Sequence, residues 1–395
     1  MYAMLTPVVK SIGVCDLDID LFESQYPVAH GITYNSYVVE GAAECAVMDT
    51  VDAHFADEWM ANLTDALGEG RTPAWLVVLH LEPDHSGTIA RAMKAWPEMK
   101  LACSAKAATM LPQFFDEAGS WAERIVPMGE GSEIDLGGGV KLTFVTAPMV
   151  HWPEVLVAFE ASEGTLFGAD AFGTFGTPGH PEPWAPEAAR YYFNICGKYG
   201  PQVQTLLKKA SALPIKRVCA LHGPVLEGEV LAEAVRLYGL WSAYEPDLEG
   251  VFIPYASIYG HTGQAAELLA ELLRERGVKA ETADLARCDM AEAVAKAFRY
   301  QALALAAASY DATVFPPMAS FLHHLAIKGF RNRPVGLIQN GSWAPTAARA
   351  MRGMIEPMKQ MTILEPEVTV KTRLTEANRP EMSALADALA AAIKK

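Results

Sequence analysis

The sequence predicts an α/β protein of two domains, one built from stacked sheets and one from a doubly wound parallel sheet. A chain of 395 residues exceeds what a single hydrophobic core usually supports. Residues 1–245 mix short apolar runs with Gly/Pro-rich loops, whereas strands and helices alternate regularly beyond residue 250. The apolar share of 51% and the lack of low-complexity tracts are typical of a folded globular protein.

The first part contains six short apolar runs, which predict stacked sheets with helices outside. These runs are AVMDTV, AWLVVLH, KLTFVTAP, VLVAFE, TLFGAD and RVCALHG. At residues 244–250, the segment YEPDLEG interrupts a helical pattern with a proline and charges, and a new apolar strand follows. We therefore expect one domain at residues 1–247 and a second at residues 250–395.

The second part alternates five strands with five helices. The expected strands are 251–256, 279–283, 302–308, 334–339 and a run near Val368, and the expected helices are 263–276, 290–300, 320–330, 345–358 and 376–394. This alternation predicts a parallel, doubly wound sheet. Sheets of this kind bind ligands at the carboxyl ends of their strands.

Charge and hydropathy exclude several partners. The formal charge of −15 repels phosphate backbones, so we expect no nucleic-acid partner. The longest apolar runs are too short to span a bilayer, and the N-terminus lacks the pattern of a signal peptide. We therefore expect a cytoplasmic protein with no membrane partner.

The six cysteines are scattered singly, without a CxxC pair. Several lie in apolar, strand-like contexts, so we expect reduced, buried thiols and no disulfide. This spacing also excludes a rubredoxin-type or iron–sulfur centre within the chain.

Four side chains of the metal-ligand type follow the apolar strand LVVL within six residues: His80, Glu82, Asp84 and His85. We expect Pro83 to prevent a regular helix here. An extended segment would send the first three side chains to similar sides, with His85 turning back. Such a loop predicts a cradle for two neighbouring ions. The alternative is a solvated surface turn.

Three further candidates each follow an apolar strand: His151 in TAPMVHWPE, Asp170 in LFGADAF and His222 in CALHGP. A single histidine after a strand is more often structural. Three candidates at strand ends, downstream of a loop dense in ligands, favour a shared metal site.

The HxExDH motif, together with His151, Asp170 and His222, resembles the metallo-β-lactamase-type domain of the flavodiiron proteins. The resemblance covers nearly the whole chain. It implies an N-terminal αββα metallo-β-lactamase-like sandwich followed by a C-terminal flavodoxin-like, five-stranded sheet. It also implies two iron atoms per chain, one on His80, Glu82 and His151, the other on Asp84, His85 and His222, with Asp170 bridging both.

Glu82 bears on the choice of metal. Zinc hydrolases of the resembling superfamily have a second histidine at this position. A hard carboxylate oxygen favours iron over the nitrogen-rich zinc site. Residues near the open coordination positions of the metal ions would determine which gas reacts. The candidates are Tyr26, His30, Tyr34, Tyr191 and Tyr192. The alternative is that these five residues serve only in ordinary packing and turns.

A second constellation begins the C-terminal domain. Hydroxyls and backbone N–H groups at a helix N-terminus suit a phosphate ester, and Ser257, Tyr259, Gly260, His261 and Thr262 supply them. Neither GKT/GKS nor GxGxxG is present, so the loop resembles that of flavodoxin, which holds the FMN phosphate without a lysine. The other expected FMN contacts are Ser309, Tyr310, Asp311, Asn340, Gly341, Ser342 and Trp343, with the two aromatic residues facing the ring.

The resemblance implies an oxidoreductase that reduces nitric oxide to nitrous oxide, dioxygen to water, or both, with electrons passing from FMN to the irons. It also implies a head-to-tail homodimer or a dimer of dimers. Because no CxxC pair exists, we expect a separate electron donor, such as a rubredoxin or a reduced soluble cofactor. The alternatives are a binuclear zinc hydrolase with a flavin-binding accessory domain, and a flavin electron carrier with a vestigial metal site.

Overall fold

The computed structural model of the chain describes residues 2–179 and 183–394, which form two compact units. Up to residue 239, the first unit holds all described residues except 193–200. The second unit holds residues 193–200 and 240–394. Residues 193–200 and 240–247, which precede the predicted domain boundary, therefore belong to the second unit.

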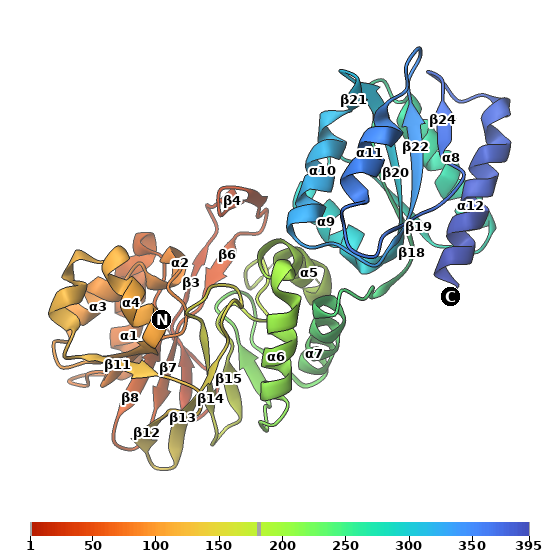
Figure 1. Ribbon diagram of the computed structural model, residues 1–395. Coiled ribbons are helices and arrows are strands. Elements are labelled where there is room, and N and C mark those ends of the chain that lie inside the picture. The colour runs from red at the N-terminus through yellow and green to blue at the C-terminus, as the bar shows by residue number, and fades with distance from the viewer. Residues whose placement is uncertain (1, 180–182, 395) are drawn as a thin grey trace. The chain divides into compact units, whose positions relative to one another are not determined.

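Two sheets form the centre of the first unit (Figure 1). One sheet contains, in spatial order, β1 (Ala3–Met4), β2 (Val9–Ser11), β7 (Tyr37–Glu40), β8 (Cys45–Met48), β9 (Trp75–Val78), β10 (Lys100–Ser104) and β11 (Ile125–Met128). The other contains β12 (Glu133–Gly137), β13 (Val140–Thr146), β14 (Leu156–Glu160), β15 (Thr165–Phe167), β16 (Arg217–Cys219) and β17 (Leu226–Glu227). Two antiparallel pairs lie apart from these sheets: β3 (Val14–Asp16) with β6 (Ile32–Tyr34), and β4 (Leu21–Phe22) with β5 (Tyr26–Pro27).

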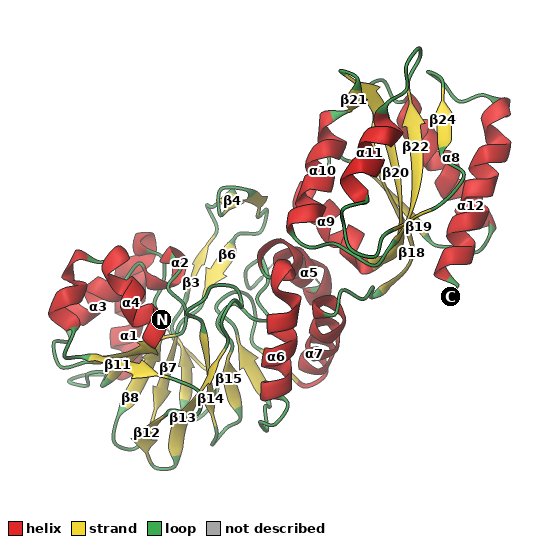
Figure 2. Cartoon of the chain, in the orientation of Figure 1, coloured by secondary structure: helices red, strands yellow, loops and turns green. Residues whose placement is uncertain are grey.

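Helices cover the outer sides of the two sheets, as the sequence predicted (Figures 1 and 2). They are α1 (Ala56–Leu67), α2 (Pro83–Ser86), α3 (Ile89–Ala95), α4 (Ala105–Met110), α5 (Trp184–Ile195), α6 (Gly200–Ala210) and α7 (Gly228–Ser242). Helix α1 shows the common pattern: Trp59, Leu63 and Ala66 recur at helical spacing and are buried. Short 3-10 turns lie at Ala53–Phe55, Leu111–Gln113, Asp116–Trp121, Gly197–Tyr199 and Glu376–Asn378.

The second unit is a parallel sheet with helices on both faces (Figure 2). Its strands are β19 (Ala280–Asp284), β18 (Leu248–Ala256), β20 (Tyr300–Tyr310) and β22 (Pro334–Asn340) in spatial order, with β23 (Thr362–Ile363) and β24 (Val368–Val370) both pairing with β22. A short strand, β21 (Thr313–Val314), pairs with the end of β20. The chain visits the strands in the flavodoxin-like order, which confirms the predicted fold.

Five helices surround this sheet: α8 (His261–Glu275), α9 (Met290–Arg299), α10 (Pro316–Ile327), α11 (Ala347–Ile355) and α12 (Arg379–Ile393). Apolar residues of α8 and α12 pack on one face of the sheet in a single buried cluster, which includes Leu269, Leu273, Leu385 and Leu389. Helix α10 begins four residues before its predicted start. Two prolines, Pro316 and Pro317, lie at its first helical positions, where a missing N–H group costs nothing.

The segment after β9 corrects another expectation. Pro83 does not prevent a helix; it begins α2, again at the first helical position. His80 and Glu82 remain in the extended segment before this helix, whereas Asp84 and His85 lie within it. The prediction erred because a proline excludes only the interior of a helix.

All six cysteines are free thiols, but they are not all buried. Cys15 is exposed in the small β3–β6 pair, and Cys288 is half-buried, so the expectation of six buried thiols is wrong for these two. None of the helices described by the structure is both long and apolar enough to cross a bilayer.

Candidate metal centre and cofactor pocket

The seven predicted metal ligands converge from four loops, each of which follows a strand of the first unit. The segment after β9, which includes the short helix α2, carries four of them, and the loops after β13, β15 and β16 carry one each. Within each of two groups, the candidate ligand atoms lie within 4.8 Å of one another. The first group is His80, Glu82, His151 and Asp170, and the second is Asp84, His85 and His222.

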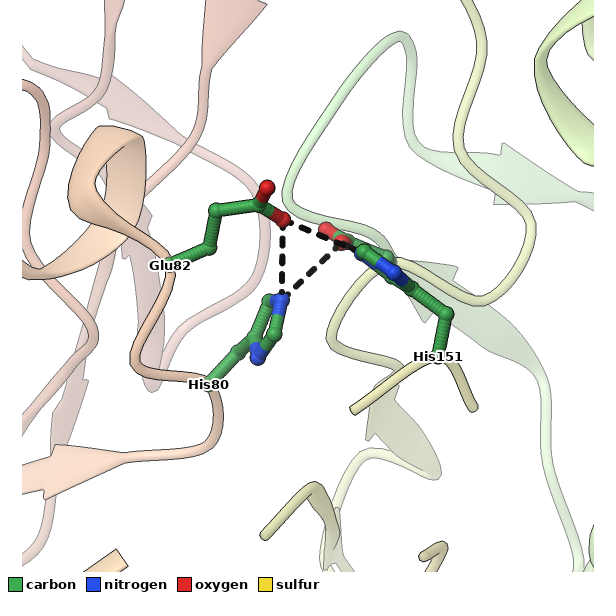
Figure 3. A group of neighbouring side chains, drawn as sticks. His80, Glu82 and His151 are labelled. Carbon is green, nitrogen blue, oxygen red and sulfur yellow. Dashed lines mark hydrogen bonds and ion pairs between the residues drawn. The ribbon is translucent and has the colours of Figure 1, made fainter. Parts of the chain in front are cut away.

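In the first group, two imidazole rings face the same carboxylates (Figure 3). Glu82 Oε2 lies 3.2 Å from His80 Nε2 and 3.0 Å from His151 Nε2. Asp170 Oδ2 lies 3.4 Å from His80 Nε2 and 3.0 Å from His151 Nε2. Two nitrogens and two oxygens therefore surround one point, which a single metal ion can occupy.

The second group repeats this arrangement next to the first. Asp84 Oδ2 lies 3.2 Å from His85 Nε2 and 3.3 Å from His222 Nε2, and the two imidazole nitrogens lie 3.0 Å apart. Asp170 faces this group with its other oxygen, Oδ1, which lies 3.3 Å from His85 Nε2. Asp170 thus presents one oxygen to each group, the geometry of a carboxylate that bridges two ions.

Several buried polar atoms of the centre make no hydrogen bond within the described chain: both carboxylate oxygens of Asp84, Asp170 Oδ1 and His85 Nδ1. A buried polar atom without a partner costs about 1–3 kcal/mol. The carboxylate oxygens are electron-pair donors that face other donor atoms, so a cation between the groups would satisfy them. The residues present therefore fit a pair of metal ions with mixed oxygen and nitrogen ligands.

The electrostatics of the ligand side chains point to the same conclusion. Burial opposes ionisation of Asp170, but His80, His151 and His85 together outweigh it and hold the Asp170 pKa well below its usual range. Burial likewise opposes the charged form of His151, yet hydrogen bonds to Asp170 and Glu82 raise its pKa to about 9. Protons on the histidines thus balance the carboxylates, and cations would replace those protons.

Outer hydrogen bonds orient two of the histidines. His80 Nδ1 donates to Glu154 Oε1 at 2.8 Å, and His222 Nδ1 donates to the Thr33 carbonyl oxygen at 2.7 Å. Each bond fixes the tautomer that leaves Nε2 free to bind a metal. Burial opposes ionisation of Glu154, but the hydrogen bond from His80, the charge of His80 and backbone N–H groups together outweigh it and lower the Glu154 pKa.

Backbone contacts hold the two ligand loops in place. Asp49 Oδ1 accepts from the backbone N–H groups of Leu79 (2.7 Å) and His80 (3.3 Å) at the end of β9. Burial raises the Asp49 pKa to about 7. Asn35 Nδ2 donates to the carbonyl groups of Ala220 and Gly223, on either side of His222. Hydrogen bonds made by Asp49 and Asn35 therefore hold the backbone beside His80 and His222 in place.

We expect Glu154→Gln to weaken metal binding by about 10- to 100-fold, the usual cost of removing an outer partner of a ligating histidine. The amide keeps the size of the side chain but loses the charge that His80 requires. Metal affinity is measured by competition with a coloured chelator. Glu69→Gln, an exposed position after α1, serves as the control and should match the wild type. Equal affinities of the two variants would contradict the assigned role.

Two of the five residues proposed to tune the gas site lie against the ligands. The Tyr34 ring centre is 6.0 Å from that of His222, and the Tyr191 ring centre is 5.5 Å from it. Tyr26 packs against Phe175, and Tyr192 packs against Tyr238. The fifth residue, His30, accepts a hydrogen bond at its carbonyl group from Thr177.

Sequence reasoning missed several residues of the centre. Glu154 and Trp152 lie in the motif HWPE directly after His151, and the Trp152 ring packs edge-on to His80 at 5.2 Å. Phe22, on β4, packs edge-on to His222 at 5.3 Å. The position of Glu154 three residues after His151 could have indicated that Glu154 lies near the metal centre. No pattern in the sequence around Phe22 indicates that it contacts a metal ligand.

The predicted cofactor residues lie together at the carboxyl ends of β18, β20 and β22. They line a pocket of about 340 Å³, with the exception of Gly260, which is not among its lining residues. Gly260 instead precedes α8 with a φ of +89°, a left-handed conformation that favours glycine. The pocket also includes residues that were not predicted: Ile258, Ala308, Ala312, Ala344, Thr346 and Thr372.

Hydrogen bonds give two predicted contacts a structural role. Ser309 Oγ accepts from the backbone N–H groups of Thr346 and Ala347, so it caps the start of α11. The Asn340 side chain donates to Thr262 Oγ1 (3.3 Å) and to the Thr372 carbonyl group (3.0 Å). These hydrogen bonds connect Asn340, at the end of β22, to the start of α8 and to the loop after β24, and so hold three sides of the pocket together.

Trp343 and Tyr259 stand at the pocket with 93% and 89% of their surface exposed. Such exposed aromatic surface suits a flat ring system. We expect Trp343→Ala to raise the dissociation constant for FMN about tenfold, because a lost aromatic contact costs roughly 1.4 kcal/mol. Fluorescence titration of the flavin measures this change, with Ile327→Ala on α10 as the control. FMN affinity equal to that of the wild type would contradict the assignment of Trp343.

The chain is similar to proteins of one family. The family model described as "ODP family beta lactamase" matches residues 32–223. Anaerobic nitric oxide reductase flavorubredoxin of Aeromonas hydrophila subsp. hydrophila is 25% identical over 389 residues, covering 95% of this chain and 75% of that protein. Putative diflavin flavoprotein A 1 of Thermosynechococcus vestitus is 30% identical over 288 residues, covering 71% of this chain and 49% of that protein.

Solved structures agree in fold. Rubredoxin oxygen:oxidoreductase of Desulfovibrio gigas superposes with a TM-score of 0.89 at 22% identity, over 100% of this chain and 99% of that one. The flavodiiron protein of Giardia intestinalis gives a TM-score of 0.87 at 21% identity, over 100% and 97%. In its two units, its sequence relatives and its fold, the chain is thus similar to the flavodiiron proteins.

Proposed function

We propose that the chain is an oxidoreductase that reduces nitric oxide to nitrous oxide, dioxygen to water, or both. The main support is the pair of buried ligand groups, which share Asp170 and include Glu82. The same chain also contains a flavodoxin-like unit. The names of the similar proteins, a nitric oxide reductase and an oxygen oxidoreductase, support the same reaction class. A zinc hydrolase would not need the flavodoxin-like unit.

We assign one iron to His80, Glu82 and His151, the other to Asp84, His85 and His222, with Asp170 between them. When bound, a di-iron pair and FMN supply the storage and stepwise transfer of electrons that a multi-electron gas reduction requires. The protein holds the ligands through Glu154, Thr33 and Asp49, and excludes bulk water with Phe22 and Trp152.

We assign FMN to the pocket of the second unit. The N-terminus of α8 would hold the phosphate, because its first backbone N–H groups lack helical partners and point along the positive end of the helix dipole. Ser257, Thr262 and the exposed aromatic residues at the same pocket support this assignment.

We further propose that residues 1–247 and 250–395 act as separate domains within a head-to-tail homodimer or a dimer of dimers. The exposed Tyr259 and Trp343 support a partner surface at the flavin pocket. The electron donor would be a rubredoxin or a reduced soluble cofactor, and six free cysteines support a reducing, cytoplasmic setting. A strictly monomeric, fully active protein in analytical ultracentrifugation would count against the assembly.

Anaerobic stopped-flow spectroscopy tests the proposed reaction. The FMN-loaded, iron-loaded protein is reduced, then mixed separately with nitric oxide and with dioxygen, while flavin oxidation is followed. We expect rapid oxidation by one or both gases, with nitrous oxide or water as the product. Flavin oxidation no faster than that of metal-free protein, with both gases, would refute the proposal.

A further inference from the structure

The first unit contains a second pocket, which is enclosed by helices α6 and α7 and by strands β15 and β16 (Figure 1). Its volume is about 460 Å³, compared with about 340 Å³ for the pocket that we assign to FMN. None of the seven metal ligands is among its described lining residues. Protein interiors are close-packed, and openings of about 300–1,000 Å³ are typical of small-molecule sites.

Apolar side chains form the floor and the walls of this pocket. Leu166 of β15 and Val218 of β16 are partners in the parallel ladder, and both lie on the floor. The walls come from two helices at helical spacing, with Leu207 and Ala210 on α6 and Leu231, Ala232 and Val235 on α7. Val235 is 47% exposed, so the pocket is open to solvent on the side of α7.

One end of the pocket carries a positive charge. Arg217 at the start of β16 is paired with Glu227 of β17, so the adjacent Lys216 and Gly228 lie opposite each other at the amino end of β16, and both line the pocket. Arg217 makes an ion pair with Glu227, whereas Lys216 is exposed and has no ion pair with any residue that the structure describes. Gly228 also begins α7, whose positive dipole end adds to the charge of Lys216.

The other end of the pocket is apolar and closed. Phe172 lies beyond the carboxyl end of β15, and its buried ring stacks on Tyr238 of α7 with the ring centres 4.2 Å apart. Helix α7 thus runs alongside the pocket from Gly228 at the charged end to Tyr238 at this one. The pocket is therefore elongated, with a single cation at one end and an aromatic ring at the other.

We propose that this pocket binds a long-chain monocarboxylate, that is, a fatty acid, with its carboxylate at Lys216 and its hydrocarbon tail directed toward Phe172. The class of ligand follows from the lining. The only other polar side chain, Ser211, donates its proton to the Lys208 carbonyl group at 2.8 Å, which leaves Lys216 as the one side-chain donor for a ligand. A nucleotide or a sugar would bury several polar groups against leucines without partners. This inference is independent of the proposed gas reduction.

Isothermal titration of the full chain with dodecanoate, below its micellar concentration, tests the charged end. We expect saturable binding of one molecule per chain. Lys216→Gln should raise the dissociation constant for dodecanoate about fivefold, the upper end of what an exposed ion pair contributes. The same variant should bind 1-dodecanol as the wild type does. Lys106→Gln, an exposed position on α4, is the control and should match the wild type with both probes. No saturable binding by the wild type, or an equal response of Lys216→Gln to the two probes, would overturn the proposal.

Filling the pocket tests its apolar part. Ala232→Trp and Ala210→Phe place rings in it from opposite walls, and each should weaken dodecanoate binding by more than about tenfold. Ala61→Trp, on the exposed face of α1, is the control. Circular dichroism and metal content identify the variants that fold. Undiminished binding to a folded pocket-filling variant would contradict the proposal. So would dissociation of a wild-type oligomer by Ala232→Trp in analytical ultracentrifugation, because the pocket would then be a contact between copies of the chain.

A crystal soaked with 12-bromododecanoate shows the direction of the ligand and does not depend on any variant. The bromine anomalous peak should lie beside Phe172, and the carboxylate should lie within hydrogen-bond distance of Lys216. A bromine peak at Lys216, or none in this pocket, would overturn the assignment.

Discussion

Replacing Asp170 by asparagine is expected to reduce gas consumption by more than about 100-fold and to remove most of the bound metal. Asp170 is buried, faces both ligand groups, and is held ionised by the neighbouring His80, His151 and His85. An amide presents one oxygen and one N–H group, so it cannot donate an electron pair to each of two ions. Even an outer partner of a ligand is worth about 10- to 100-fold, and a shared ligand should be worth more.

Metal content, gas consumption with an electrode and flavin absorbance measure the effect of Asp170→Asn. Flavin absorbance should be unchanged, because the pocket that we assign to FMN lies in the other unit. Asp65→Asn, on the exposed face of α1, makes the same chemical change away from the centre and should behave as the wild type. Full metal content and full turnover in Asp170→Asn would refute the assigned site.

Metal binding is expected to stabilise the first unit strongly. The ligand atoms converge only in the folded chain, so an ion binds the folded state and not the unfolded one. At a free metal concentration about a thousandfold above the dissociation constant, this stabilises folding by about 4 kcal/mol. For a unit of this size, 1 kcal/mol shifts the melting temperature by about 2–4 °C, so we expect a shift of roughly 10 °C.

Anaerobic calorimetry of metal-free protein, with and without ferrous iron, measures this shift. FMN should raise the melting temperature of the second unit instead, which makes the two transitions distinguishable. His85→Ala serves as a variant in which the effect of iron should shrink, since one of its ligands is gone. A first transition that ferrous iron leaves in place would contradict the account.

The metal ligands could be predicted from the sequence where each one directly follows a recognisable apolar strand. His80, His151, Asp170 and His222 each follow a strand that reads as an apolar run, and strands of stacked sheets end at a common edge. The alternation beyond residue 250 similarly predicted the parallel sheet, because each helix is long enough to cross back between neighbouring strands.

The remaining features depend on tertiary contacts that no local pattern records. Glu154 and His80 are 74 residues apart, and His222 and Thr33 are 189 residues apart. Phe22 lies in a segment with little apolar periodicity, so its position beside His222 emerges only from the packing of the β4–β5 hairpin. The helical turn at Pro83 was missed for a different reason: the same residue breaks a helix in its interior and favours one at its start.

Anomalous diffraction from crystals of anaerobically purified protein, recorded on both sides of the iron absorption edge, tests the central claim most directly. The account predicts two iron peaks per chain, one among His80, Glu82 and His151, the other among Asp84, His85 and His222. The Asp170 carboxylate should lie between the peaks. Two peaks that appear only at the zinc edge, or no metal among these residues, would contradict it.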